Sequence, residues 1–254
     1  MIWGTFGIAH ILSLIIGAGL LVGFYFLLKE KSEKAKIIIL GILSFSGIAA
    51  IIFNLVAWGS PYEYLPLHLC SLNALVLPIA VFKRSNVLSN LLLLWSLGAL
   101  MALVVNTAQA EFVIFSPTFC VYYFPHLLEF GIPILMFKLG LVKKEARYIG
   151  STIGITLGVY TLIHFINVYL NKYFIDEQIT NASGEIIKVN YMYSVRPEIP
   201  LLELFWSFVP CEYWYMLPVL LVIVIYLFLL YIKQLLPLVK HLGGDVYGKN
   251  QKAE

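Results

Sequence analysis

The sequence predicts an all-α membrane protein in which seven transmembrane helices form a single domain over residues 1–254. Composition is the first reason, because 61% of the residues are hydrophobic, only 12% are charged, and the mean hydropathy is +0.89. A soluble domain is about half apolar and about a quarter charged. Spacing is the second reason: apolar stretches of roughly 20 residues, the length that crosses a bilayer, recur between short charged segments.

Each predicted helix ends where charged residues or a proline interrupt the apolar run. In chain order the predicted helices are residues 3–28, 37–59, 67–82, 87–106, 118–139, 149–170 and 213–231, the last extending as far as Leu236. The breaks after the first, second, third and fifth helices are the charge run 29–36, Ser60-Pro61, Lys83-Arg84 and Lys143-Lys144. A polar outer loop, residues 171–211, follows the sixth helix, and residues 237–254 are predicted to form a cytoplasmic tail.

Loop charges predict the orientation of the bundle. Lysine and arginine gather in alternate loops, which the positive-inside rule places in the cytoplasm. These basic residues follow the first, third, fifth and seventh helices: Lys29, Lys31, Lys34, Lys36, Lys83, Arg84, Lys138, Lys143, Lys144, Arg147, Lys233, Lys240, Lys249 and Lys252. The short loops between them, residues 60–66 and 107–117, contain no Lys or Arg. The alternation predicts an N-terminus outside and a C-terminus inside.

Several function classes find no support in the sequence. The net charge is only +3, and no basic patch interleaved with aromatic residues suggests a nucleic-acid partner. The three cysteines, Cys70, Cys120 and Cys211, lack the paired spacing of a disulfide framework or a zinc site. The N-terminus enters an apolar stretch with no basic region before it, which predicts a retained first helix and not a removed signal peptide.

Polar side chains are predicted to gather in the outer half of the bundle. Four of the five histidines lie inside apolar segments, and an ionisable group in lipid is costly unless it has a partner or a task. The predicted orientation places these residues at similar depth: His10, Asn54, His68, Cys70, Ser71, Asn73, Asn106, His126, Glu129, His164 and Asn167. They predict one polar cavity in the outer leaflet, although the asparagines also suit hydrogen bonds between helices.

Spacing favours His126 as the reactive imidazole. His126 and Glu129 are three residues apart and share a helix face, and a neighbouring carboxylate raises the basicity of an imidazole and fixes its tautomer. His68 and Cys70 are two residues apart, so both reach one site only if Pro66 precedes an irregular helix start. A base beside Cys70 would convert its thiol into a nucleophilic thiolate.

Three kinds of function are compatible with this pattern. The first is an enzyme that acts on lipid acyl esters, either an acyltransferase or a hydrolase. The second is a transporter or proton or ion relay that uses the histidines, although the sequence shows no inverted repeat and no charged residue deep in the cytoplasmic half. The third is an intramembrane metal site built from His and Glu, although the HExxH motif is absent.

Three motifs resemble a known family. Residues 65–71 (LPLHLCS) resemble the same stretch of the YwaF-like bacterial integral membrane proteins, and residues 123–126 (YFPH) resemble that family's aromatic-plus-His motif on a later helix. Residues 190–193 (NYMY), followed by Arg196-Pro197 and by residues 210–215, resemble its last outer loop. These matches cover most of the chain.

The YwaF-like family is distantly similar to an animal transmembrane acyltransferase that moves polyunsaturated chains onto ether lysophospholipids, and to the androgen-induced membrane hydrolases. The resemblance implies Cys70 as the nucleophile and His126 as the general base. In the animal enzyme the Cys immediately precedes the His, whereas here the order is His68, Leu69, Cys70. Ser71, on the same turn, is the second candidate nucleophile.

These observations together define the expected site. Glu129 is expected to orient His126, and His68 to donate a hydrogen bond to an oxyanion or to the substrate. The expected lining of the cavity is His10, Asn54, Asn73, Asn106, His164 and Asn167. The expected partners are membrane phospholipids or lysophospholipids, with no metal and no cofactor, in a multi-pass protein of the bacterial plasma membrane.

Overall fold

The computed structural model describes residues 1–57, 61–106 and 109–250, with side chains as far as Pro237. This part of the chain is helical, with no strand beyond two isolated bridges. The α-helices are α1 (Ile8–Lys29), α2 (Glu33–Ser44), α3 (Ser46–Ala57), α4 (Leu69–Lys83), α5 (Asn86–Val104), α6 (Pro117–Lys138), α7 (Ile149–Asp176), α8 (Pro200–Phe208) and α9 (Leu217–Asn250). Short 3-10 turns are η2 (Ala146–Tyr148), η3 (Tyr191–Tyr193) and η4 (Trp214–Met216).

Six helical segments of the described chain are long and apolar enough to cross a membrane. They are Ile8–Lys29, Glu33–Ala57, Asn86–Val104, Pro117–Lys138, Ala146–Asp176 and Trp214–Pro237. The segment Glu33–Ala57 combines α2 and α3, which meet at Phe45. The predicted third span is α4, an apolar helix of 15 residues. The protein is therefore an all-helical, multi-pass membrane protein, and its described residues contain six long apolar helical segments and the shorter α4.

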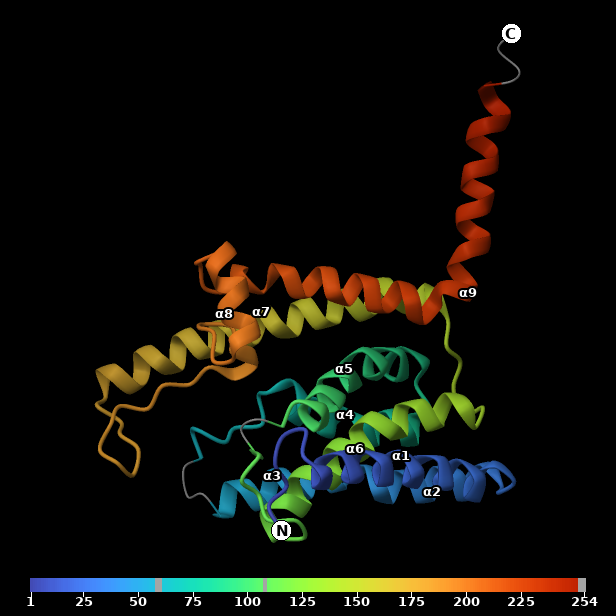
Figure 1. The fold of residues 1–254 in the computed structure, drawn as a ribbon. Helices are drawn as coiled ribbons and strands as arrows, with labels where there is room; N and C mark the ends of the chain where they lie inside the picture. Colours follow the sequence, from blue (N-terminus) through green and yellow to red (C-terminus); the bar gives the residue numbers. More distant parts are fainter. Residues whose placement is uncertain (58–60, 107–108, 251–254) are drawn as a thin grey trace.

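Several predicted boundaries differ from the structure: the first helix begins at Ile8 and not at residue 3, and the last at Leu217 and not at residue 213. The predicted outer loop 171–211 begins later, because α7 continues to Asp176, and it contains the helix α8. The predicted tail 237–254 continues α9 as helix to Asn250, while residues 251–254 lie outside the described residues. Figure 1 shows that α9 changes direction in its last part, and Pro237 lies inside the helix. Proline removes a helical hydrogen bond and bends the helix there.

The interior of the bundle lies between α4, α5 and α6, which run alongside one another in Figure 1. Leu77, Leu92, Ile132 and Met136 from these helices are fully buried in one apolar cluster. Outer helices are tied to this centre by polar side chains. The indole Nε1 of Trp95 on α5 donates to Thr156 on α7 over 3.0 Å.

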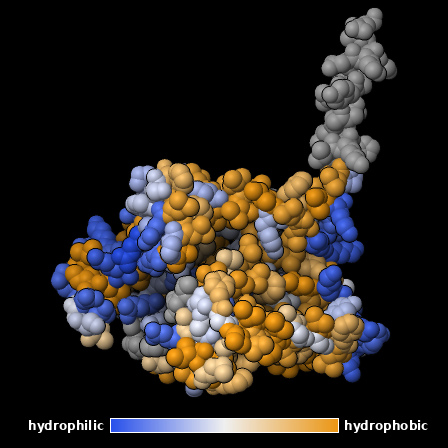
Figure 2. All heavy atoms as spheres, viewed as in Figure 1, coloured by the Kyte–Doolittle hydropathy of each residue, from blue (hydrophilic) through white to orange (hydrophobic). Residues whose placement is uncertain are grey.

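The sides of the molecule are apolar and its two ends are hydrophilic (Figure 2). Large exposed apolar side chains lie on several of the long helices, among them Ile16, Ile52, Phe165, Leu221 and Leu229. In water such a surface would drive aggregation, whereas lipid tails solvate it. Figure 1 shows the N-terminus, α8 and the segment before α8 together at one end of the bundle. We refer to this as the N-terminal end.

Candidate functional site

A cavity of about 300 Å³ opens between α3, α4 and α6. Its walls are Gly47, Ala50, Ile51 and Asn54 on α3, Cys70, Ser71 and Ala74 on α4, and Thr118, Val121, Tyr122, Pro125, His126 and Glu129 on α6, with Tyr64, Gln109 and Phe112 from loops at the N-terminal end. Five residues singled out from the sequence meet here: Asn54, Cys70, Ser71, His126 and Glu129.

One face of α6 forms the longest wall of the cavity. Thr118, Tyr122, Pro125 and Glu129 recur at intervals of three or four residues, which is the spacing that aligns side chains along one helix face. Glu129 lies 12 residues beyond Pro117, the first residue of α6, or about 18 Å along the helix. The cavity thus reaches from the loops to about the middle of a bilayer whose core is about 30 Å thick.

Glycine at position 47 lets α3 approach the other two helices. A Cβ atom added at Gly47 would lie 2.7 Å from Oε1 of Glu129 and would also meet the Cβ of Ala74. Gly47 stands in the first turn of α3, just after the interruption at Phe45. The break in the second span therefore places a helix N-terminus beside a buried carboxyl group.

Cys70 lies in the first turn of α4. His68 is the N-cap residue and offers no side-chain acceptor to that turn. The hydroxyl and backbone N–H of Ser71 and the N–H of Cys70 itself are placed to interact with the Cys70 sulfur. Donors at a helix N-terminus stabilise a thiolate, and they also stabilise an oxyanion that forms beside it.

His126 is held by its own helix. Its Nδ1 lies 2.6 Å from the backbone carbonyl of Tyr122, and the two rings pack with their centroids 4.4 Å apart. A carbonyl oxygen only accepts hydrogen bonds, so Nδ1 carries the proton and Nε2 of the neutral ring keeps its lone pair. The group that fixes the tautomer of His126 is this carbonyl, whereas the sequence led us to expect Glu129.

Glu129 is buried, with 4% of its surface exposed, and lines the cavity. Its Oε2 atom finds no hydrogen-bond partner anywhere in the described structure. It lies within electrostatic range of His126 and Cys70. A buried carboxyl oxygen without a partner is costly, and such a group at a cavity wall is free to bind what enters the cavity.

His10 and Asn106 lie away from the cavity and hold the N-terminal segment. Nε2 of His10 donates to the carbonyl of Leu103 over 2.8 Å, and its Nδ1 accepts from the N–H of Phe6 over 2.9 Å. The amide of Asn106 donates to the carbonyl of Gly4 over 2.8 Å. Both residues join the start of the chain to the end of α5.

His68, expected to act with Cys70, packs outside the cavity against η3. Its ring lies 5.4 Å from that of Tyr191 and 5.9 Å from that of Tyr193, measured between centroids. Its Nδ1 accepts a long hydrogen bond, 3.4 Å, from the N–H of Met192. The motifs at 65–71 and 190–193 therefore meet in space.

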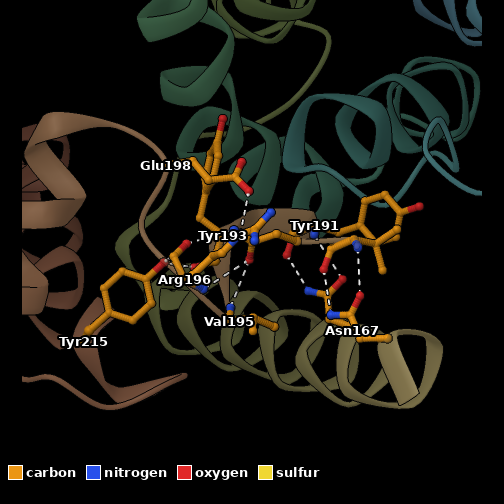
Figure 3. Close-up of polar contacts among 10 residues, drawn as sticks. Asn167, Tyr191, Tyr193, Val195, Arg196, Glu198 and Tyr215 are labelled. Atoms are coloured by element: carbon orange, nitrogen blue, oxygen red, sulfur yellow. Dashed lines mark hydrogen bonds and ion pairs between the residues drawn. The ribbon is translucent and has the colours of Figure 1, made fainter. Parts of the chain in front are cut away.

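Asn167 and His164 anchor the loop before α8 to α7 instead of lining the cavity. The amide of Asn167 donates to the carbonyl of Tyr191 and accepts from its N–H, over 2.8 and 3.0 Å, and also donates to Ser194 (Figure 3). His164 lies 3.3 Å from the hydroxyl of Ser194. Asn171, one turn beyond Asn167, pairs in the same way with the backbone of Val189.

Asn73 occupies a third kind of position. Its side chain is fully buried on α4, outside the cavity lining, and neither of its amide atoms has a hydrogen-bond partner within the described residues. Asn73 was predicted to line the cavity, and the structure places it outside the lining. Nothing in the structure explains why an amide stands at this position.

Sequence reasoning did not single out four polar lining residues: Tyr64, Gln109, Thr118 and Tyr122. Tyr122 could have been found, because it stands four residues before His126 and thus shares its helix face. The other three lie at or near loops, where no helical periodicity indicates which way a side chain points. Within the described residues, no group of three or more His, Cys, Asp or Glu side chains could hold a metal ion.

Comparison with known families gives one result. The model of the TMEM164 family matches residues 5–231. The chain belongs to the TMEM164 family. No curated protein and no solved structure matches it.

The region shared with the TMEM164 family contains the whole candidate site. It begins just before α1 and ends at Tyr231 within α9, so every residue that lines the cavity lies inside it. The part of α9 beyond Tyr231 lies outside the matched region.

Proposed function

We propose that this member of the TMEM164 family is a membrane enzyme that acts on lipid acyl esters, as an acyltransferase or a hydrolase, with Cys70 as nucleophile and His126 as general base. The observation that carries the proposal is that one cavity is lined by a thiol at a helix N-terminus and by an imidazole whose Nε2 keeps its lone pair. The resemblance to YwaF-like proteins, and through them to an acyltransferase, points to the same pair.

The proposed first half-reaction uses atoms present in the site and a phospholipid ester. Nε2 of His126 takes the proton of the Cys70 thiol, and the sulfur attacks the ester carbonyl carbon. A carbon–sulfur bond forms, the carbon–oxygen bond breaks, and the proton passes from Nε2 to the leaving oxygen, which departs as a lysophospholipid. The N–H groups of Cys70 and Ser71 stabilise the charge on the carbonyl oxygen.

In the second half-reaction a hydroxyl group attacks the Cys70 thioester. A new carbon–oxygen bond forms, the carbon–sulfur bond breaks, and the proton of the hydroxyl group ends on the sulfur. A lysolipid acceptor gives acyl transfer, and water gives hydrolysis. Both products come from one site, because the two acceptors present the same hydroxyl group.

The depth of the cavity favours an enzyme over a relay. A relay needs polar groups that continue across the bilayer. Beyond Glu129 the buried residues of α6 are apolar, among them Ile132, Leu135 and Met136 in the central cluster. A cavity that ends there supports a substrate pocket.

The test is covalent labelling of the detergent-solubilised protein with phosphatidylcholine that carries an alkyne-tagged acyl chain. We expect a hydroxylamine-sensitive label that is lost in Cys70→Ala and in His126→Ala. Cys120→Ala is the matched control, because Cys120 is a half-buried cysteine outside the cavity lining, and it should keep the label. A label that survives Cys70→Ala refutes Cys70 as the nucleophile, and its loss in Ser71→Ala would then identify Ser71.

We also infer seven crossings, with the N-terminus outside. The 15 residues of α4 span about 22 Å, which is most of a core of about 30 Å, and the segment Leu65–His68, which turns where the N–H of Leu67 donates to the carbonyl of Leu65, precedes it. In a protein whose exposed Cys211 is replaced by alanine, a cysteine introduced at Glu111 should then react with a membrane-impermeant maleimide in intact cells, and one at Lys31 should not. Equal labelling of the two positions would contradict this topology.

A further inference from the structure

Glu129 has no task in the half-reaction that forms the thioester. The proton on Nδ1 of His126 is held by the Tyr122 carbonyl, so the ring is oriented without a carboxylate. Yet Glu129 is a buried ionisable group in a transmembrane helix, and its Oε2 is unpaired in the described structure. Groups of this kind are costly in a membrane and mark functional positions.

One feature of the surroundings of Glu129 stabilises its charged form, which accepts a hydrogen bond. The first turn of α3 stands beside Oε1, since a Cβ at Gly47 would be 2.7 Å away. Backbone N–H groups at a helix N-terminus carry partial positive charge and stabilise an anion. A helix that begins within the membrane therefore faces the one acidic side chain among the residues that line the cavity.

The cavity that Glu129 lines accepts a small polar group. Asn54 on α3 and Ser71 on α4 line the same cavity and supply an amide and a hydroxyl. A volume of about 300 Å³ is many times the volume of about 10–15 Å³ that one water molecule needs. That is room for water or for the hydroxyl-bearing part of a lipid.

We propose that Glu129 forms the acceptor subsite, in which it binds the incoming hydroxyl group and takes its proton as that group attacks the Cys70 thioester. This inference rests on the proposed function, and it assigns the two half-reactions to different bases, His126 for acylation and Glu129 for deacylation. As the carbon–oxygen bond forms and the carbon–sulfur bond breaks, the proton moves from the acceptor oxygen to Oε2. It then returns from Glu129 to the Cys70 thiolate.

The two half-reactions can be measured separately. The protein is labelled with the alkyne-tagged phosphatidylcholine, excess donor is removed, and loss of the thioester is followed with and without added lysophosphatidylcholine. In Glu129→Gln we expect labelling within about twofold of the wild type and thioester decay slowed at least tenfold, because a general base contributes about 10²–10⁴ to a rate.

Controls make the result specific. Glu111→Gln removes an exposed carboxylate outside the cavity lining and should leave both rates unchanged. Decay that accelerates with lysophosphatidylcholine identifies a lipid hydroxyl as the acceptor, and decay that ignores it identifies water. Either behaviour supports the subsite if thioester decay is slower in Glu129→Gln than in the wild type. The melting temperature of Glu129→Gln is measured in parallel to establish that the variant is folded.

Two results would overturn the inference alone. Labelling that falls in Glu129→Gln as far as in His126→Ala would mean that Glu129 serves acylation, and unchanged decay would mean that it contacts no acceptor. A wild-type protein without a Cys70-dependent thioester would instead refute the proposed function, and the subsite with it.

Discussion

His10 and His126 hold opposite tautomers. In His10 the Nε2 donates to the carbonyl of Leu103 and Nδ1 accepts from the backbone, so both ring nitrogens are used. In His126 the Nδ1 donates to the carbonyl of Tyr122 and Nε2 remains available to the cavity. Two intramembrane histidines that look alike in the sequence thus differ in whether a ring nitrogen keeps an available lone pair, which a general base requires.

This difference predicts opposite mutant phenotypes. His10→Ala leaves the buried carbonyl of Leu103 and the partly buried N–H of Phe6 without their partner, so we expect the free energy of unfolding to fall by about 1–3 kcal/mol. Thermal unfolding in detergent would measure this as a lower melting temperature. His126→Ala should change the melting temperature less and should abolish thioester formation. A His10→Ala protein of wild-type stability would contradict the structural role of His10.

Gly47 is predicted to be the least replaceable small residue of the cavity. In Gly47→Ala the new methyl group overlaps Ala74 and the Glu129 carboxyl group, and we expect destabilisation by about 1–3 kcal/mol together with loss of activity. The control is Gly154→Ala on α7, where a Cβ meets nothing within 4 Å. That variant should be as stable as the wild type or slightly more stable, because Ala favours helix. Equal melting temperatures for the two variants would argue against the close approach of α3.

Asn167 is predicted to hold the loop before α8 in place. Asn167→Ala removes both hydrogen bonds to the backbone of Tyr191 and the one to Ser194. We expect hydrogen exchange of the amides in residues 189–194 to rise at least tenfold, which corresponds to about 1.4 kcal/mol of lost protection. Lys172→Ala, an exposed position on the same helix, should leave the exchange unchanged. Protection that survives in Asn167→Ala would show that other contacts hold the loop.

The raised pKa of the Tyr191 phenol predicts a loss of stability at high pH. Burial raises the pKa of Tyr191 to about 12, whereas a phenol in an unfolded chain titrates near pH 10. The folded protein therefore keeps the phenolic proton longer, and the stability that this contributes is present below about pH 10 and lost between about pH 10 and 12. The hydroxyl group donates to the carbonyl of Tyr62. Melting temperatures of Tyr191→Phe should fall less steeply over this range, and identical slopes would contradict the prediction.

The helical bundle and much of the cavity could be predicted because helix periodicity and lipid compatibility are local properties. The apolar runs gave every long helix, and spacing put His126 and Glu129 on one face. The interruption at Phe45 was not predicted, although Ser44, Ser46 and Gly47 stand beside it and such Gly/Ser pairs are sites of helix kinks. Its effect depends on the packing of Gly47 against α4 and α6.

The predicted depth of a residue in the membrane indicated less reliably than its helix face whether the residue lines the cavity. His10, His164 and Asn167 lie at the expected end of the bundle, yet their hydrogen bonds go to the backbone of neighbouring segments. The loop at 187–194 packs inward against α7, where a polar outer loop was expected. Whether a polar side chain faces a cavity or a neighbouring backbone depends on partners that are distant in the chain.

The sequence by itself determined that this is a helical membrane protein. Exposing unpaired backbone N–H and C=O groups to lipid is costly, and an apolar run avoids that cost by forming a helix. The sequence also determined which helices carry ionisable groups. Only the tertiary structure decided that Cys70, His126 and Glu129 share one cavity, and which nitrogen of each histidine is free. These properties arise from hydrogen bonds and packing between helices, which no single segment specifies.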